Sequence, residues 1–416
     1  MTHPVFLHIG PPRSGTSYLR NLVWHNKRTL ARHGLLYPGF TEHPHDAAVA
    51  DLLGRAGHVD GTDGADGVDG SGVTARDRAG AWDRIALAVS EWDGGALVAH
   101  EGLVLADDSQ IREARQSFQG RDVHVVYTAR DLSRVIPATW QARLRAGSTQ
   151  TWASFTDELR DSSGFGTADG TGERTGDVTG DRFWSTQGGA ALERWAADLE
   201  PDHVHVVTVP RAGTDRGLLW ARYAAVLGLD PVDYDTDVPF PIDTLGLVES
   251  AYLRHFNATA ADRLSPDDHR AGVRQVMRAA ALDRPAGRAR LQMTPAELEW
   301  LRPRCDALVS LIDKGGYDVH GDLADLIPAG TSVPERCEPR SVTSSDLLDL
   351  SIRTVVALVE SQAQTTRELR ALQAAPPPSP VRGTGGSGMR RAFTFLLGHR
   401  LRKPVLSLYH RFRRRA

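Results

Sequence analysis

Residues 10–17, GPPRSGTS, bring together small residues, one cation and three hydroxyl side chains directly after a short apolar run. A strand, a loop of small residues and a helix N-terminus form a site for an anion, because unpaired N–H groups and the helix dipole favour negative charge. Gly10 and Gly15 keep the glycine spacing of a triphosphate-binding loop, but Thr16 stands where that motif has lysine. The only cation is Arg13. We therefore expect an anion other than a magnesium-bound triphosphate. A plain Pro/Gly turn before a capped helix is the alternative, although a turn needs neither an arginine nor two hydroxyls.

Two further sets of polar residues follow apolar runs later in the chain. Arg130 comes after the run 123–128, and His100 and Glu101 come after the run 96–99. In open α/β sheets, ligands lie at the carboxyl ends of the strands, so these side chains are expected at the same edge as the first loop. Glu101 could accept a proton directly, and the ordinary histidine pKa of about 6.5 suits His100 to the same task. A helix cap beside a surface histidine is the competing interpretation.

The elements that must position these residues are strands alternating with helices. Apolar, β-branched runs without strict alternation predict buried strands at 5–9, 96–99, 123–128 and 204–209. Helical spacing between them predicts helices at 15–33, 78–91, 131–146, 187–198 and 216–227. This alternation predicts an α/β fold with a doubly wound parallel sheet flanked by helices.

Composition divides the chain into a large domain and a different C-terminal region. We expect one domain over 1–328, with Gly/Asp/Thr-rich insertions at about 57–72 and 161–181 that cannot offset their own ordering entropy. A long helix is expected at 344–373, followed by a Pro/Gly linker at 374–388. The helix is long enough to pair with a second copy of the chain.

Residues 389–416 form a basic tail with nine Lys or Arg and no acid, so the net charge of −3 leaves −12 on the rest of the chain. Leucine and aromatic residues alternate with these cations, which predicts an amphipathic segment on an anionic membrane surface. That partner is favoured over nucleic acid, and a solubilising tail without a partner is the third possibility. The chain has two cysteines, no secretory signal and no apolar run of spanning length, which predicts a cytoplasmic protein. The basic tail would make it peripheral at the inner face of the membrane.

The segment that opens the chain resembles sulfotransferases that use 3′-phosphoadenosine 5′-phosphosulfate. Their loop usually reads Pro-Lys-(Ser/Thr)-Gly-Thr-(Thr/Ser) after a strand, and the matching residues here are Pro12, Arg13, Ser14, Gly15, Thr16 and Ser17. The family also has Arg-Asp after a later strand, similar to VHVVYTARDLSRVIPATWQARLRAG at 123–147. Segments 204–230 and 316–328 are similar to the family's later strand–helix unit and terminal segment, so the resemblance spans about 3–328.

The resemblance implies a P-loop-like fold, a sulfuryl donor and roles for single residues. Residues Pro12 to Ser17 would hold the phosphosulfate, with Arg13 stabilising charge on the bridging oxygen, and Arg130 would bind the 3′-phosphate. Ala138 occupies the position of the family's partner serine, and Ser133 or Thr139 could stand in for it. No metal is expected. Either His100 or Glu101 would be the base, with a slight preference for Glu101.

The expected reaction moves a sulfuryl group to a hydroxyl of a carbohydrate, lipid or metabolite acceptor, and the sequence does not specify which. A nucleotide-dependent kinase or NTPase, or a catalytically silent nucleotide-binding scaffold, remains the alternative. Thr16 argues against a kinase, whereas Ala138 leaves the scaffold open.

Five further residues are candidates for the site. Trp140 and Gln141 could line an acceptor cleft, although a helix tryptophan is more often core. His8 is expected to be a packed histidine. Arg254 and Asn257 could lie at the edge of the cofactor site, but they could equally belong to a solvent-exposed helix face.

Overall fold

A computed structural model describes residues 2–40, 44–54, 75–162, 179–215, 217–238, 245–282, 289–328 and 339–374. The expected insertion at 57–72, most of the one at 161–181, the linker beyond its first residue and the basic tail lie outside these ranges. The chain divides into two compact units, Met1–Leu358 and Val359–Ala416, and the boundary falls within the last helix.

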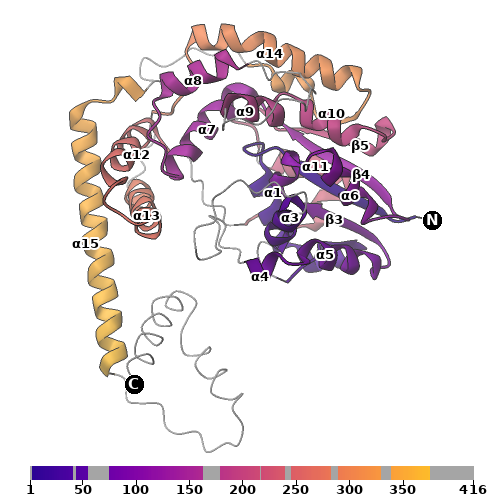
Figure 1. The fold of residues 1–416 in the computed structure, drawn as a ribbon, viewed down its shortest axis with the longest axis horizontal. Coiled ribbons are helices and arrows are strands. Elements are labelled where there is room, and N and C mark those ends of the chain that lie inside the picture. The colour runs from indigo at the N-terminus through magenta and orange to yellow at the C-terminus, as the bar shows by residue number, and fades with distance from the viewer. Residues whose placement is uncertain are drawn as a thin grey trace, which may run out of the picture. The chain divides into compact units, whose positions relative to one another are not determined.

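Six parallel strands form one sheet in the order β2-β3-β1-β4-β5-β6. Figure 1 shows the sheet, with β3, β4 and β5 labelled, among the helices that flank it. The central strand β1 pairs with β3 on one side and β4 on the other. The strands are β1 (Pro4–Gly10), β2 (Leu35–Leu36), β3 (Gly95–Ala99), β4 (Asp122–Ala129), β5 (Val204–Thr208) and β6 (Asp318–His320). The chain is therefore an α/β protein with an all-parallel sheet flanked by helices, as the sequence predicts.

The helices lie between and after these strands. The α-helices are α1 (Thr16–His25), α2 (Lys27–Arg32), α3 (Pro44–Gly54), α4 (Ala75–Arg78), α5 (Ala81–Ser90), α6 (Asp108–Gln116), α7 (Leu132–Arg145), α8 (Trp152–Asp161), α9 (Thr179–Gln187), α10 (Ala190–Ala196), α11 (Gly217–Val226), α12 (Leu247–Ala260), α13 (Pro266–Leu282), α14 (Pro295–Lys314) and α15 (Ser344–Ala374). Short 3-10 helices are η1 (Glu101–Leu105), η2 (Pro201–His203), η3 (Pro231–Asp233), η4 (Leu323–Leu326) and η5 (Pro339–Ser341).

Each face of the sheet has its own hydrophobic core, because successive side chains of a strand point to opposite faces. Val5, Leu7 and Ile9 of β1 pack in a cluster that includes residues of α3, α5, α6 and α7. Phe6 packs in a second cluster with residues of α1, α2 and α11. Burial on both faces explains why the strands read as continuous apolar runs in the sequence.

The four strands expected from the sequence are confirmed as β1, β3, β4 and β5. The expected helix 15–33 is two helices, α1 and α2, which meet at Asn26. The amide of Asn26 donates to the carbonyl oxygen of Asp235 at 2.8 Å, and its Oδ1 accepts from the N–H of Asp235 at 2.9 Å. This tertiary contact with a distant segment accompanies the break.

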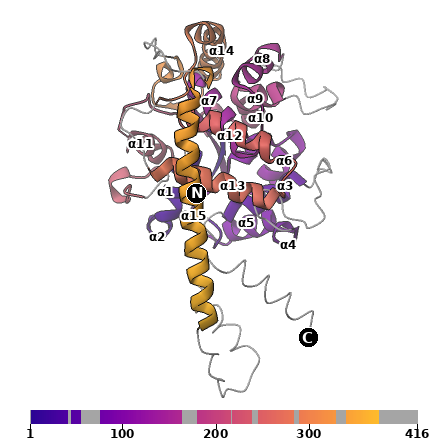
Figure 2. The ribbon, with the colours of Figure 1, turned by 90° about the vertical axis from the view of Figure 1, so that its left-hand side faces the viewer.

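The expected long helix at 344–373 is confirmed as α15, a continuous helix in Figure 2. Its N-terminal half exposes a row of apolar side chains: Leu348, Ile352, Val355, Val356 and Leu358. Among the described helices, none combines the length and the hydropathy that a membrane-spanning segment needs.

Candidate functional site

The loop between β1 and α1, residues 10–15, has a backbone that requires glycine at both ends. Gly10 has φ 96° and Gly15 has φ 88°, and Arg13 between them also has a positive φ of 69°. A Cβ at Gly10 would lie 3.0 Å from the Cα of Glu101, so a side chain there would crowd the backbone of η1. The loop is thus pressed against the segment that carries the expected base.

The helix that follows the loop begins without a side-chain cap. Gly15 is the N-cap of α1, and the first helical hydrogen bond runs from the N–H of Leu19 to its carbonyl. The N–H groups of the first turn, including those of Thr16 and Ser17, therefore have no intrahelical partner. Ser17 is exposed and Thr16 is buried. This helix end has the donors and the dipole that an anion needs.

Buried hydroxyl groups fix the loop to β4. Ser14 and Thr128 have no exposed surface, and their hydroxyl oxygens are 2.6 Å apart. The Ser14 hydroxyl is also 2.5 Å from the carbonyl oxygen of Pro11, and the Thr128 hydroxyl is 3.0 Å from that of Gly10. Each hydroxyl carries one hydrogen, so the two groups donate two hydrogen bonds among these three contacts. We call these bonds the Ser14–Thr128 relay. Ser14 is thus a residue that shapes the loop from within.

Arg130 follows β4 and reaches the loop. One Nη1 hydrogen bond of 2.6 Å joins it to the carbonyl oxygen of Arg13. Burial lowers the pKa of Arg130 to about 10, with a further lowering from the positive charges of Arg134 and Arg13. Its Nε is buried and makes no hydrogen bond within the described residues. The positive charges of Arg13 and Arg134 therefore act on Arg130, and an anion bound here would reduce the repulsion among the three guanidinium groups.

Arg13 interacts electrostatically both with Arg130 and with the carboxylate of Glu101. Partial desolvation by the surrounding protein lowers the pKa of Arg13, and the negative charge of Glu101 opposes that shift. Glu101 begins η1, and its Oε2 is 3.5 Å from an Nη1 of Arg20. Oε2 is buried and accepts no hydrogen bond within the described ranges. Glu101 thus keeps an oxygen that can accept a proton.

His100, the other candidate base, has both ring nitrogens engaged. Nδ1 accepts a hydrogen bond of 2.9 Å from the N–H of Gly102, which makes His100 the N-cap of η1. Nε2 is 3.2 Å from Oδ1 of Asp46. Burial would raise the pKa of Asp46, but bonds and charges from His100 and Arg20 lower it to about 2. His100 is therefore hydrogen-bonded at both ring nitrogens, whereas Oε2 of Glu101 has only its 3.5 Å ion pair with Arg20 among the described residues.

The residues considered as substitutes for the family's serine lie on α7. Asp131 is the N-cap of this helix and accepts a 2.8 Å hydrogen bond from the N–H of Ser133. Burial raises the pKa of Asp131, and hydrogen bonds from Ser133 oppose the shift. The hydroxyl of Thr139 donates to the carbonyl of Val135 at 2.9 Å, and Ala138 offers no polar group. Ser133, in the first turn, is the substitute that lies nearer to Arg130 along the chain.

Two supporting residues were not identified from the sequence. Gln187 of α9 donates to the carbonyl oxygen of Pro12 at 2.8 Å, and Arg134 of α7 donates to that of Pro210 at 2.8 Å. Arg134 is one helical turn beyond Arg130, so helical spacing could have indicated it. No local sequence signal indicates Gln187, because its partner is 175 positions away.

His8 is a packed histidine, as expected. It is 1% exposed, and its Nδ1 is 3.1 Å from the hydroxyl of Tyr223. Its Nε2 is 3.4 Å from Oγ1 of Thr128, the residue that carries the relay. Burial, together with the charge of Arg20, lowers the pKa of His8 to about 3, so it is neutral at pH 7.

Three of the remaining candidates, Trp140, Gln141 and Asn257, have structural roles. Trp140 is fully buried and its Nε1 donates to the carbonyl of Gln150 at 3.0 Å. Gln141 is buried and donates to the carbonyl of Leu245 at 3.0 Å. Asn257 is also buried, at 1% exposure, and donates to the carbonyl of Leu144 at 2.7 Å. A solvated helix face is therefore the wrong explanation for Asn257.

The strand order explains why the β1–α1 loop and Arg130 meet. From β1 the chain continues to β2 on one side of the sheet, and from β4 it continues to β5 on the other side. Adjacent strands whose connections leave in opposite directions form a topological switch point, where ligands of open α/β sheets bind. The loop and Arg130 both lie at this point, at the carboxyl ends of β1 and β4.

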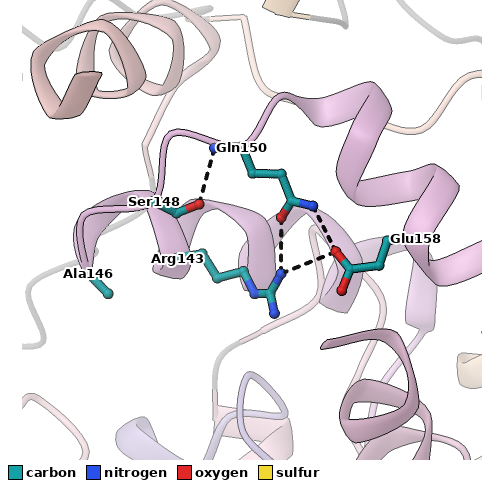
Figure 3. Close-up of a pocket in the computed structure, with 5 residues that line it drawn as sticks. All are labelled: Arg143, Ala146, Ser148, Gln150 and Glu158. Carbon is teal, nitrogen blue, oxygen red and sulfur yellow. Dashed lines mark hydrogen bonds and ion pairs between the residues drawn. The ribbon is translucent and has the colours of Figure 1, made fainter. Parts of the chain in front are cut away.

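A pocket of about 330 Å³ lies elsewhere, between the end of α7 and the start of α8 (Figure 3). Its polar groups contact one another: Arg143 donates to Gln150 at 3.1 Å, Gln150 donates to Glu158 at 2.7 Å, and the Arg143 guanidinium is 3.9 Å from Glu158. Arg143 is 13 residues beyond Arg130, or about 20 Å along a helix. This pocket is not part of the site at the loop.

Compared with protein-family models, with curated proteins and with solved structures, the chain shows no match.

Proposed function

We propose that the protein is a P-loop-like sulfotransferase that moves a sulfuryl group from 3′-phosphoadenosine 5′-phosphosulfate to a hydroxyl of a carbohydrate, lipid or metabolite acceptor. The observation that carries the proposal is the meeting of Arg13 and Arg130 at one helix N-terminus, with a 2.6 Å bond from one to the backbone of the other. The donor carries anionic groups at both its 5′ and 3′ positions, and two neighbouring arginines match that distribution of charge.

Each residue of the loop has a role in this proposal. Amide groups and hydroxyls of Thr16 and Ser17 hold the phosphosulfate, while Pro12, Ser14 and Gly15 shape the loop around it. Arg130 binds the 3′-phosphate, with Ser133 as the added donor in place of the serine replaced by Ala138. Arg13 stabilises the charge that builds up on the bridging oxygen. Removing such a preorganised group typically slows a reaction by about 100- to 1,000-fold.

The reaction itself is an in-line displacement at sulfur. A bond forms between the acceptor oxygen and sulfur while the bond from sulfur to the bridging phosphate oxygen breaks. The acceptor proton passes to Glu101, and 3′-phosphoadenosine 5′-phosphate leaves. Arg20, bonded to Asp46 at 2.6 Å and paired with Glu101, keeps that carboxylate near the loop. The proposal routes no step through a metal.

Calorimetry of the full chain tests the proposal at its binding step. We expect micromolar binding of 3′-phosphoadenosine 5′-phosphate and no binding of ATP with magnesium. Arg130→Gln should weaken the first ligand by at least about tenfold, since a charge-assisted hydrogen bond contributes roughly 1.5–3 kcal/mol. Arg32→Gln, on the exposed surface of α2, is the matched control and should change nothing. A preference for ATP with magnesium would assign the protein to kinases or NTPases.

A silent scaffold is the second candidate, because both nitrogens of His100 are engaged and Ala138 is not a serine. A silent scaffold and an enzyme would both bind the nucleotide, so a binding assay does not separate them. The assay must therefore follow transfer of labelled sulfate from the donor to a panel of hydroxylated acceptors. Binding together with no transfer to any acceptor would favour the scaffold. Transfer that is lost in Glu101→Gln but kept in His100→Gln would support the enzyme and its base.

Location and assembly are further parts of the proposal. The protein is cytoplasmic in this view, and residues 389–416, outside the described ranges, would bring it to the inner face of the membrane. A second copy pairing through α15 would cover the apolar row that starts at Leu348. Ile352→Glu in that row should then lower the mass measured by light scattering.

A further inference from the structure

Three neighbouring strands begin with the same arrangement of polar residues. Asp122-Val-His124 opens β4, His203-Val-His205 runs from the end of η2 into β5, and Asp318-Val-His320 forms β6. Residues two apart on a strand point to the same face of a sheet. The strands pair with one another in parallel, and His205 is directly opposite Asp318. Four histidines and two aspartates are therefore collected at the amino ends of these strands.

Two groups of potential metal ligands result. Asp122, His124 and His203 have ligand atoms within 4.8 Å of one another, and so do His205, Asp318 and His320. Imidazole nitrogens and one carboxylate are the ligands that zinc and related divalent metals prefer. We call the first group the Asp122 triad and the second the Asp318 triad.

The atoms of the Asp122 triad converge on one point. Oδ1 of Asp122 is 2.8 Å from Nε2 of His203, and its Oδ2 is 3.2 Å from Nε2 of His124. The two imidazole rings are stacked, with centroids 4.6 Å apart. All three side chains are partly exposed, so a water can complete a four-coordinate shell.

The outer partners of these histidines hold Nδ1 and turn Nε2 of each ring toward Asp122. Nδ1 of His203 is 2.7 Å from Oδ1 of Asp202, and a carboxylate only accepts, so Nδ1 carries hydrogen. For the same reason Nδ1 of His205, 2.8 Å from Asp318, carries hydrogen. Nε2 of neutral His205 then accepts from Nδ1 of His124 at 2.9 Å. Nε2 of His124 and Nε2 of His203 both face the carboxylate of Asp122, so a metal bound there would replace the hydrogens that these two nitrogens donate to Asp122.

The same hydrogen bond makes the two triads exclude each other. A metal in the Asp318 triad would use Nδ1 of His205, which requires hydrogen on its Nε2. A metal in the Asp122 triad requires hydrogen on Nδ1 of His124. Two N–H groups would then face each other across 2.9 Å, which a hydrogen bond cannot satisfy. One chain can hold one metal in this way, not two.

We propose that the Asp122 triad binds one divalent transition metal of the zinc class per chain, with Asp202 and His205 orienting its two histidines. Metal-bound histidines almost always donate their other N–H to such an outer partner. Within the described residues, Nδ1 of His320 has no such partner, which disfavours the Asp318 triad. The site is six residues from Arg130 along β4, about 20 Å at strand spacing, so it is separate from the loop.

The site would act by joining elements. A metal on Asp122, His124 and His203 links β4 to η2, the segment that leads into β5. Binding to the folded chain stabilises it by mass action, so the thermal midpoint should rise with metal concentration. This inference does not depend on the reaction proposed for the loop.

Equilibrium dialysis of the full chain against Zn²⁺, with metal counted by mass spectrometry, tests the proposal. We expect one ion per chain and, with Co²⁺ in place of Zn²⁺, the visible absorption of a four-coordinate ion. His203→Gln should weaken binding by at least about 100-fold, and Asp202→Asn by about 10-fold, since outer partners typically contribute 10- to 100-fold. His320→Gln and the exposed control His25→Gln should bind as the native chain does.

Several results would overturn the proposal. The first is two ions per chain, and the second is no ion bound to the native protein. The third is that His320→Gln loses metal binding while His203→Gln keeps it. Circular dichroism of each metal-free variant shows whether it is folded. Asp202→Asn keeps every proposed ligand in place, so it remains informative if a ligand variant does not fold.

Discussion

Replacing Thr128 with valine tests whether β4 holds the β1–α1 loop in position. The change keeps the branched shape of the side chain and removes the hydroxyl of the Ser14–Thr128 relay. That oxygen is 2.6 Å from Ser14, 3.0 Å from the carbonyl of Gly10 and 3.4 Å from His8. All of these contacts are buried, so water cannot replace the lost partner.

The magnitude follows from the number of bonds. Each buried hydrogen bond contributes about 1 kcal/mol net, and a buried acceptor left without a donor costs roughly 1–3 kcal/mol. Loss of the bonds to Ser14 and Gly10 therefore predicts a decrease of about 2–4 kcal/mol in the free energy of unfolding. A methyl group in place of the oxygen also cannot approach Ser14 to 2.6 Å, so the loop must move. A shift that weakens anion binding by about 1.4 kcal/mol reduces affinity tenfold.

Thr156→Val is the matched control, because Thr156 is also buried but has a single local bond of 2.9 Å to the carbonyl of Ala153. Urea unfolding should show a loss of about 1 kcal/mol in the control and a larger loss in Thr128→Val. Calorimetry with 3′-phosphoadenosine 5′-phosphate should show weaker binding in Thr128→Val alone. Equal stability losses in the two variants, or weaker binding in the control, would refute this account of the loop.

Three further predictions concern separate features. Gly10→Ala should lower the free energy of unfolding in urea by more than Gly34→Ala does. Both glycines have positive φ (96° and 82°), but of the two only Gly10 is crowded by a neighbouring backbone. Equal losses in the two variants would contradict this. Burial lowers the pKa of His8 to about 3, so between about pH 6.5 and pH 3 the unfolded chain binds a proton at this position and the folded chain does not. In that range the free energy of unfolding should fall by roughly 1.4 kcal/mol for each pH unit of acidification, and His8→Gln should remove this contribution. His25→Gln, a change at an exposed histidine, should leave that slope intact. Vesicles with anionic lipid should sediment the full chain more strongly than a chain ending at Ala375, and equal partitioning would exclude a membrane role for the tail.

Local sequence patterns were sufficient for the sheet's buried strands. The runs at 5–9 and 123–128 are apolar on both faces because helices cover both faces, and such runs have few alternatives to a buried strand. The short strands β2 and β6 were not predicted, since two or three residues give too little periodicity. Their pairing with β3 and β5 supplies what their own sequence lacks.

The candidate site was predictable in its parts and not in its contacts. The spacing of Gly10 and Gly15 indicated the loop, and the ends of apolar runs indicated Arg130 and Glu101. No local pattern indicated that both nitrogens of His100 are engaged, because one partner, Asp46, is on α3. The relay partner of Ser14 is likewise 114 positions away.

The sequence by itself determined the elements of this protein: the glycine-bounded loop, the apolar strands and the long helix α15. These depend on φ preferences, hydrophobic periodicity and turn chemistry, which act over a few neighbouring residues. Only the tertiary structure decided which strand ends meet, and therefore that Arg13 and Arg130 share one environment and that Asp122, His124 and His203 converge. Parallel strands need long connections, so residues that become neighbours in the sheet are separated by tens of residues in the chain. Their contacts depend on strand order, which no local window of sequence contains.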